Sequence, residues 1–143
     1  MKRNKHLVTA IGVGFVFVMI FLAVTYDFIR AQECQIIRLK GTAYPNTTIN
    51  IEPKTIQIPK GGCVVWVNWI RDPEVQIAFE EGKKCEDMTD ASTGFKMDAR
   101  NCYVTSFVPL GGTSSLRFNE VGTFSYEITA GGGSKEKGEI IVK

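Results

Sequence analysis

The chain has 143 residues, of which 44% are hydrophobic, and a formal net charge of +2; this length holds one domain of ordinary size and little more. Five charged residues precede position 31 and are mostly basic, namely Lys2, Arg3, Lys5, Asp27 and Arg30. The later residues therefore carry 13 basic and 14 acidic side chains. A net charge of −1 gives no support for nucleic-acid binding, because the basic excess lies in the N-terminal flank.

A long apolar segment follows the basic N-terminal flank at residues 1–6. Positions 7–29 are apolar or small with no charge before Asp27, and these 23 residues are enough, at helical rise, to cross a hydrocarbon core of about 30 Å. The apolar region of a cleaved signal peptide has only about 7 to 15 residues, and positions 27–33 lack a small-x-small cleavage site. We predict a retained transmembrane signal-anchor helix at 7–29, with signal-peptide cleavage as the alternative.

The charge asymmetry also predicts the orientation of this anchor. A basic flank stays on the cytoplasmic side, so residues 30–143 are expected on the periplasmic or extracellular side of the cell membrane. All four cysteines lie in this part of the chain, as expected for disulfides formed in an oxidising compartment. We predict bridges between Cys85 and Cys102 and between Cys34 and Cys63, although four cysteines allow three connectivities.

From Cys34 onward the sequence has short apolar runs separated by turns rich in Gly and Pro, without a helical period. The run at 63–69 is apolar at both alternating sets of positions, which is typical of a strand covered on both faces. About eight such runs predict an all-β Greek-key sandwich. They lie near 49–51, 56–58, 63–69, 75–79, 103–108, 114–118, 123–129 and 139–142.

One segment interrupts this pattern. Residues from about 80 to 102 are polar and charged, show no period, and are bracketed by Cys85 and Cys102. We interpret them as a surface insertion that includes at most a short helix. Closing this loop by a disulfide contributes about 3 kcal/mol in the chain-entropy model.

The order and spacing of several motifs resemble the cupredoxin family, the blue-copper proteins and related domains. The motifs are Ile51-x-Pro53-x-Thr55-Ile56-x-Ile58-x-x-Gly61, Val65-Trp66-Val67-Asn68, Pro109-Leu-Gly-Gly-Thr113 and Phe118-x-x-x-Gly122-Thr123-Phe124-x-Tyr126. They cover roughly residues 35–143, and the last is the most specific. The resemblance implies a Greek-key cupredoxin-like β-sandwich after the N-terminal helix; an immunoglobulin-like sandwich is the alternative.

The resemblance also implies where a copper site would be. A blue-copper centre takes two imidazoles, one thiolate and a weak axial thioether. By the family's pattern the first imidazole falls at about Val75, the thiolate at Ile128, the second imidazole at about Gly131 and the thioether near Ser134 or Lys135. The single histidine of the chain is His6, in the N-terminal flank. We therefore expect no type 1 copper and no other cofactor.

A softer metal site is a second possibility within the polar segment. Cys85, Met88, Met97 and Cys102 lie close in sequence, and sulfur ligands suit Cu(I). A disulfide explains the two cysteines more simply. Catalysis has little support, because no histidine is present beyond position 6 to act as a base and the cysteines form no Cys-x-x-Cys motif. We expect no enzyme.

Recognition of a partner is the remaining use of the domain. In cupredoxins the end that carries the ligand loops also docks partners, and its counterparts here are the stretches 69–73 and 130–137. Within them the candidate interface residues are Trp69, Ile70, Arg71, Gly131, Gly132 and Gly133. Trp69 and Ile70 pack inward in the alternative interpretation. We interpret the three glycines as a flexible linker between strands, with a backbone surface held against a partner as the alternative. We predict a membrane-anchored structural or partner-binding subunit of an envelope complex. The alternative is a redox protein that uses the Cys/Met segment for copper or thiol–disulfide exchange.

Overall fold

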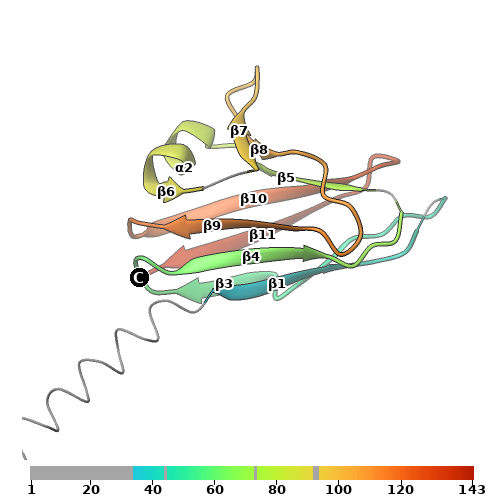
Figure 1. Cartoon of the computed structure of the whole chain (residues 1–143), viewed down its shortest axis with the longest axis horizontal. Helices are drawn as coiled ribbons and strands as arrows, with labels where there is room; N and C mark the ends of the chain where they lie inside the picture. The colour runs from blue at the N-terminus through green and yellow to red at the C-terminus, as the bar shows by residue number, and fades with distance from the viewer. Residues whose placement is uncertain (1–33, 44, 73, 92–93) are drawn as a thin grey trace, which may run out of the picture. The chain divides into compact units, whose positions relative to one another are not determined.

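The computed structural model describes residues 34–143 apart from positions 44, 73 and 92–93. The predicted flank at 1–6 and transmembrane helix at 7–29 lie outside these residues. Within them, no helix is long and apolar enough to cross a membrane. The described part contains eleven strands and one short helix, arranged as two sheets packed face to face (Figure 1).

The two sheets differ in size and mix neighbours from distant parts of the chain. Sheet A has the order β2 (Asn50–Glu52), β1 (Gln35–Lys40), β4 (Cys63–Asn68), β9 (Thr113–Phe118) and β6 (Thr89–Asp90). Sheet B has the order β3 (Thr55–Ile58), β11 (Lys135–Val142), β10 (Gly122–Ala130), β5 (Val75–Phe79), β8 (Tyr103–Thr105) and β7 (Phe95–Met97). Only the pairs β1–β4 and β3–β11 are parallel. The predicted all-β sandwich is confirmed for the described residues.

Aromatic side chains from both sheets meet in the middle of the sandwich. Trp66 of β4 contacts Tyr126 of β10 at 5.5 Å and Phe79 of β5 at 6.1 Å between ring centroids, both edge to face. All three are at most 1% exposed. Edge-to-face geometry is favourable beyond the area that the rings bury, so these three side chains hold the sheets together.

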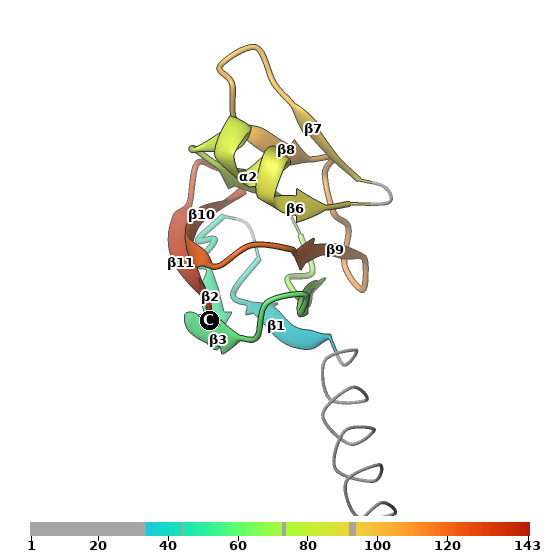
Figure 2. The ribbon, with the colours of Figure 1, turned by 90° about the vertical axis from the view of Figure 1, so that its left-hand side faces the viewer.

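The segment from 80 to 102 is more ordered than the sequence suggests. It forms helix α2 (Gly82–Met88) and the strands β6 and β7, which extend the edges of sheets A and B. Figure 2 shows α2 and β6 beside β7 and β8 at one side of the domain. Cys85 is buried, and the Phe95 ring lies 6.1 Å from that of Trp66. Elements of two to seven residues are too short to give a periodic signal in the sequence.

One of the two predicted disulfides is present. Cys34 is bonded to Cys63, with 4.5 Å between their Cα atoms, and this bond attaches the start of β1 to the start of β4. Cys85 and Cys102 are both free thiols, so the structure does not contain the bridge predicted between them. Cys85 faces inward from α2, whereas Cys102 is half-buried in the approach to β8.

Candidate functional site

A buried asparagine holds the loops together at the end of the sandwich where β4 finishes. The side chain of Asn68 donates to Val108 O at 2.9 Å and accepts from Ile70 N at 2.8 Å. Its backbone N donates to Gly112 O, and its backbone O accepts from Gly111 N. One of these bonds lies within the segment that leads from β4 to β5, and the other three join this segment to residues 108–112. Asn68 is fully buried, so these bonds fix both segments at this end.

The β10–β11 hairpin reaches the same end of the domain. Ala130 N donates to Ser134 O and Gly133 N donates to Ala130 O, which closes a tight turn over 130–134. Gly132 and Gly133 adopt φ values of +83° and +84°, a region that favours glycine. The Ser134 hydroxyl donates to Thr47 O and ties the turn to the loop after β1. The three glycines therefore belong to a short turn, and β11 begins already at Lys135.

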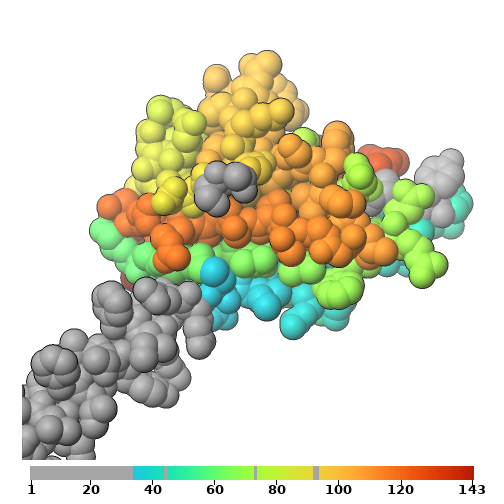
Figure 3. Space-filling model, viewed as in Figure 1, coloured from blue at the N-terminus to red at the C-terminus, as the bar shows by residue number. Residues whose placement is uncertain are grey.

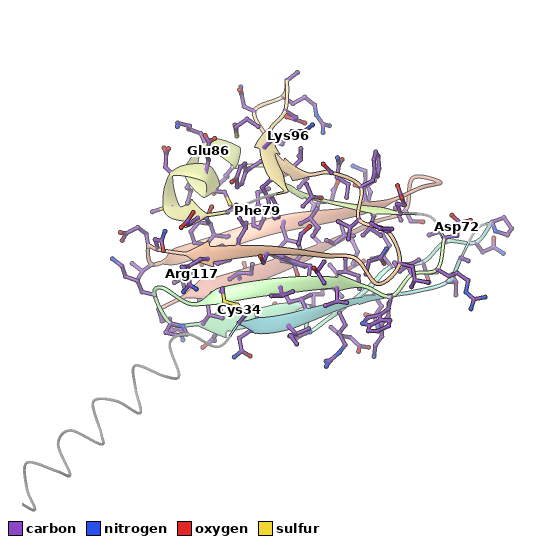
Figure 4. All side chains as sticks on the ribbon, viewed as in Figure 1. Cys34, Asp72, Phe79, Glu86, Lys96 and Arg117 are labelled. Carbon is purple, nitrogen blue, oxygen red and sulfur yellow. A yellow bond between two sulfur atoms is a disulfide. The ribbon has the colours of Figure 1, made fainter. Side chains whose placement is uncertain are left out.

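A shallow hollow lies where these segments meet. Asp72, Glu74, Phe107 and Gly131 line it, and its volume is about 330 Å³. Asp72 is labelled in Figure 4 at this end of the domain. Phe107 is 64% exposed, and neither carboxylate forms an ion pair with a described residue. The hollow therefore offers one exposed aromatic ring and two negative charges.

The structure divides the predicted interface residues among three environments. Trp69 is 56% exposed, and Arg71, Gly132 and Gly133 are also exposed. Ile70 is fully buried in the core, so its predicted place in an interface is wrong; the bond from Ile70 N to Asn68 turns it inward. Gly131 lines the hollow.

Three of the positions that the cupredoxin pattern assigns to copper ligands are Val75, Ile128 and Gly131, whose side chains have no donor atom, and the fourth falls near Ser134 or Lys135. Val75 and Ile128 are fully buried in sheet B, and Ile128 pairs with Ile77 across β10 and β5. Val75 exchanges backbone hydrogen bonds with Val108. No group of three or more His, Cys, Asp or Glu side chains is close enough to hold a metal ion among the described residues.

The four sulfur-containing residues of the 80–102 segment are spread over α2, β7 and the approach to β8. Met88 and Met97 pack against the hydrophobic core. Burial raises the pKa of the Cys85 thiol to about 12, which keeps it protonated at neutral pH. Because the thiolate is the metal ligand and the nucleophile, Cys85 is poorly suited to either role in this conformation.

Glu74 and Phe107 were not predicted as residues of the site, whereas Asp72 belongs to the stretch 69–73 that was expected at this end. Asp72 and Glu74 stand in a short turn, where charged residues are usual. Phe107 follows the apolar run Tyr103–Thr105 and was expected to continue that strand, but β8 ends at Thr105 and residues 106–107 leave the sheet. A signal was present in Pro109, which limits how far a strand can continue beyond residue 108.

Comparison with known proteins gives the fold. No protein-family model matches the chain, and no curated protein matches it. Among solved structures, amicyanin from Paracoccus versutus is similar with a TM-score of 0.51 and 16% identity over 78% of this chain and 82% of that one. The oxidized form of an amicyanin mutant gives a TM-score of 0.50 and 17% identity over 77% and 82% of the two chains. Residues 34–143 thus adopt a cupredoxin-like β-sandwich.

Proposed function

We propose that residues 30–143 form an exported cupredoxin-like module without type 1 copper, anchored in the cell membrane by residues 7–29. The module serves as a structural or partner-binding subunit of an envelope complex. The observation that carries this proposal is chemical: the domain contains no imidazole, and the buried side chains of Val75 and Ile128 stand where the family has copper ligands.

Copper does not fit these residues. A type 1 centre requires two imidazoles and a thiolate in a constrained arrangement, and an isoleucine at the thiolate position offers no donor atom. Gly131, at about the second imidazole position, contributes only backbone to the hollow. The strands that hold a copper site in the family remain, whereas the ligand set does not.

The hollow at this end supports binding of another protein. An exposed aromatic ring beside charges is the composition of an interface with an apolar centre and a polar rim. Asp72 and Glu74 favour a partner that presents Lys or Arg next to an apolar side chain, because complementary charges select and orient partners. Asn68 holds the surrounding segments in place before binding, which lowers the entropy cost of association.

Binding is a better use of the hollow than catalysis. The domain has no histidine to act as a general base, and Asp72 and Glu74 are exposed. The competing candidate is a redox protein that uses Cys85, Met88, Met97 and Cys102. One observation favours it, namely that Cys85 and Cys102 are not consumed in a disulfide; the high pKa of Cys85 weighs against it.

Metal analysis tests the first half of the proposal. The full-length chain, produced in copper-supplemented medium and desalted, is expected to contain far less than one copper per chain. One copper per chain would overturn the proposal. Loss of that copper in Cys85→Ser with Cys102→Ser would then assign it to the sulfur residues.

Cross-linking in the native membrane tests the second half. We expect the wild-type chain to cross-link to a defined envelope protein, and Asp72→Lys with Glu74→Lys to reduce the yield about tenfold, as expected for two rim charges reversed. Glu80→Lys with Glu139→Lys makes the same charge change elsewhere and should leave the yield unchanged. An equal cross-linking yield for all three chains would contradict the proposed site.

A further inference from the structure

The outer face of sheet A carries a continuous apolar stripe that the hollow does not include. Side chains alternate between the faces of a strand, and the buried Trp66 and Asn68 of β4 point into the sandwich. Val65 and Val67 therefore point outward, and Ile36 of β1 pairs directly with Val65. Trp69 continues this alternation, with its backbone N bonded to Leu39 O. We call Ile36, Val65, Val67 and Trp69 the β4 stripe.

The β4 stripe is accessible over much of its length. Ile36 is 47% and Trp69 56% exposed, and the two valines are half-buried. From Val65 to Trp69 the stripe extends about 13 Å at the rise of a strand. Figure 3 shows the segments of β1, β4 and β9 lying side by side on the face toward the viewer. Contiguous exposed apolar groups rimmed by polar residues mark interaction sites.

Basic side chains flank the β4 stripe on both sides. Arg38 of β1 pairs with Val67, and Arg117 of β9 pairs with Cys63. Neither arginine forms an ion pair with a described residue, although Arg117 Nη1 donates to Gly61 O at 2.6 Å. Lys40 is already bound to Glu52 at 2.6 Å. Arg38 also stands opposite Glu52, and Arg117 stands opposite Asp90 on the edge strand. With Lys40 and Glu52 bound to each other, Arg38, Arg117 and Asp90 leave this face with a small positive excess.

The neighbouring strand leaves room beside the stripe. Ser115 and Thr113 of β9 point outward next to Val65 and Val67; both carry a hydroxyl, and Ser115 is smaller than its valine neighbour. A groove of about 190 Å³ begins at this edge, lined by Cys34, Cys63, Asp90, Ser115, Leu116 and Arg117. The outer face of sheet A thus combines the apolar β4 stripe, the polar side chains of Ser115 and Thr113 beside it, and a guanidinium group on either side.

From this combination we infer that the outer face of sheet A docks an acidic amphipathic helix of another protein. The apolar face of the helix lies on the β4 stripe, and its Asp and Glu side chains bind Arg38 and Arg117. Charge complementarity favours this occupant over a second copy of the chain, because a second copy would present the same positive excess. This inference does not rest on the hollow proposed above as a docking site.

Two matched peptides test the inference on the full-length chain in detergent solution. Both have about 18 residues, long enough for partial helicity, with leucines spaced three and four apart. One carries Glu at the flanking positions and the other Lys. The emission of Trp69, isolated by comparison with Trp69→Phe, reports contact with the stripe. The Glu peptide is expected to bind at least about tenfold more tightly than the Lys peptide at low salt.

Charge reversal provides the decisive comparison. Arg38→Glu with Arg117→Glu should invert the preference between the peptides, whereas Lys135→Glu with Lys137→Glu, on the outer face of sheet B, should leave it unchanged. Val67→Ser should weaken binding of both peptides. The inference is overturned if neither peptide binds, if both bind equally, or if the reversal has no effect. It is also overturned if the Trp69 emission changes on self-association of the chain or on addition of anionic vesicles, and does not change with the Glu peptide.

Discussion

The outer faces of the two sheets follow the same alternation of side chains but have different compositions. On sheet B the outward residues of β10 and β11 are mainly polar, namely Thr123, Ser125, Glu127, Thr129, Lys135, Lys137 and Glu139, with Ile141 as the half-buried apolar exception. Lys135 binds Glu127 at 2.6 Å, and Lys137 lies 3.4 Å from Glu80. On sheet A the corresponding positions of β4 are Val65, Val67 and Trp69.

Because of this difference, the outer face of sheet B needs no partner other than water, whereas the outer face of sheet A leaves apolar side chains exposed to water. Lys135 and Lys137 on sheet B form ion pairs and the other outward side chains are mainly polar, so solvent is a sufficient partner for that face. The β4 stripe exposes apolar groups, and the flanking Arg38 and Arg117 form no ion pair with a described residue. Because the inner faces of both sheets share one core, the contrast concerns the surface alone. Substitutions on inner faces should change stability, and those of exposed side chains on the outer face of sheet A should change binding. The Cys34–Cys63 disulfide is an exception, because it is a covalent link between β1 and β4.

The disulfide on the outer face of sheet A should give the largest effect on stability. Cys34→Ser with Cys63→Ser removes a bond between residues 29 apart in sequence, and we expect the free energy of unfolding to fall by about 3–4 kcal/mol in the chain-entropy model. Urea denaturation at neutral pH measures this. Cys102→Ser is the control, because Cys102 is a free thiol. A comparable loss in the control would indicate a native bridge to Cys85.

Gly138 gives the next largest effect, from the inner face of sheet B. A Cβ atom at this position would lie 2.3 Å from the hydroxyl oxygen of Tyr126, and Tyr126 is 1% exposed. Gly138→Ala should therefore cost about 1–3 kcal/mol, the usual range for overpacking. Ser125→Ala, on the outer face of the paired strand, should change the midpoint of urea denaturation little. Equal stability of both variants would show that the Tyr126 ring moves freely.

Sequence patterns predicted the sandwich but misread one side of its central strand. In the run Cys63–Trp69 both alternating sets of positions are apolar, apart from Asn68. This pattern normally means that both faces of the strand are buried. Burial is observed for Val64 and Trp66, whereas the set formed by Val65, Val67 and Trp69 faces outward. Periodicity reports that a position is apolar; whether another element covers it depends on the rest of the structure.

The candidate site was predicted only in part, for a similar reason. Local sequence indicated the turns, and Trp69 and Gly131 were placed at the correct end of the domain. Ile70 also lies at this end but is buried in the core, because its direction is set by the bond to the Asn68 side chain rather than by its own apolar character. Phe107 meets Gly131 and Asp72 in the hollow across more than 20 positions of sequence, a distance over which no local pattern carries information.

Paired valine substitutions on β4 compare the two faces of one strand directly. Val65→Thr with Val67→Thr keeps the side-chain shape and the β propensity, and the half-buried hydroxyls can reach water, so the free energy of unfolding should change by less than about 1 kcal/mol. Val64→Thr places a hydroxyl in the core, where Val64 is fully buried, and should cost about 1–3 kcal/mol if the group finds no partner. Urea denaturation of both variants measures the difference. Similar losses would mean that the outer face is also covered in solution.

The smallest effect concerns the ion pairs that complete the outer face of sheet B. A hydrogen bond from Lys135 lowers the pKa of Glu127 below its ordinary value of 4.5. A carboxyl whose pKa is lowered in the folded state stabilises the fold above its unfolded pKa, and this contribution is lost as the pH falls through the lowered folded value. Lys135 is largely exposed, so the contribution should be only a few tenths of a kcal/mol.

Urea denaturation between pH 7 and 3 should show a shallower acid dependence in Glu127→Gln than in the wild type. Glu139→Gln should not change the slope in the same way, because Glu139 has no ion-pair partner among the described residues. If the two variants behave alike, the charges on this face are simply solvated, and the contrast with sheet A rests on the exposed β4 stripe alone.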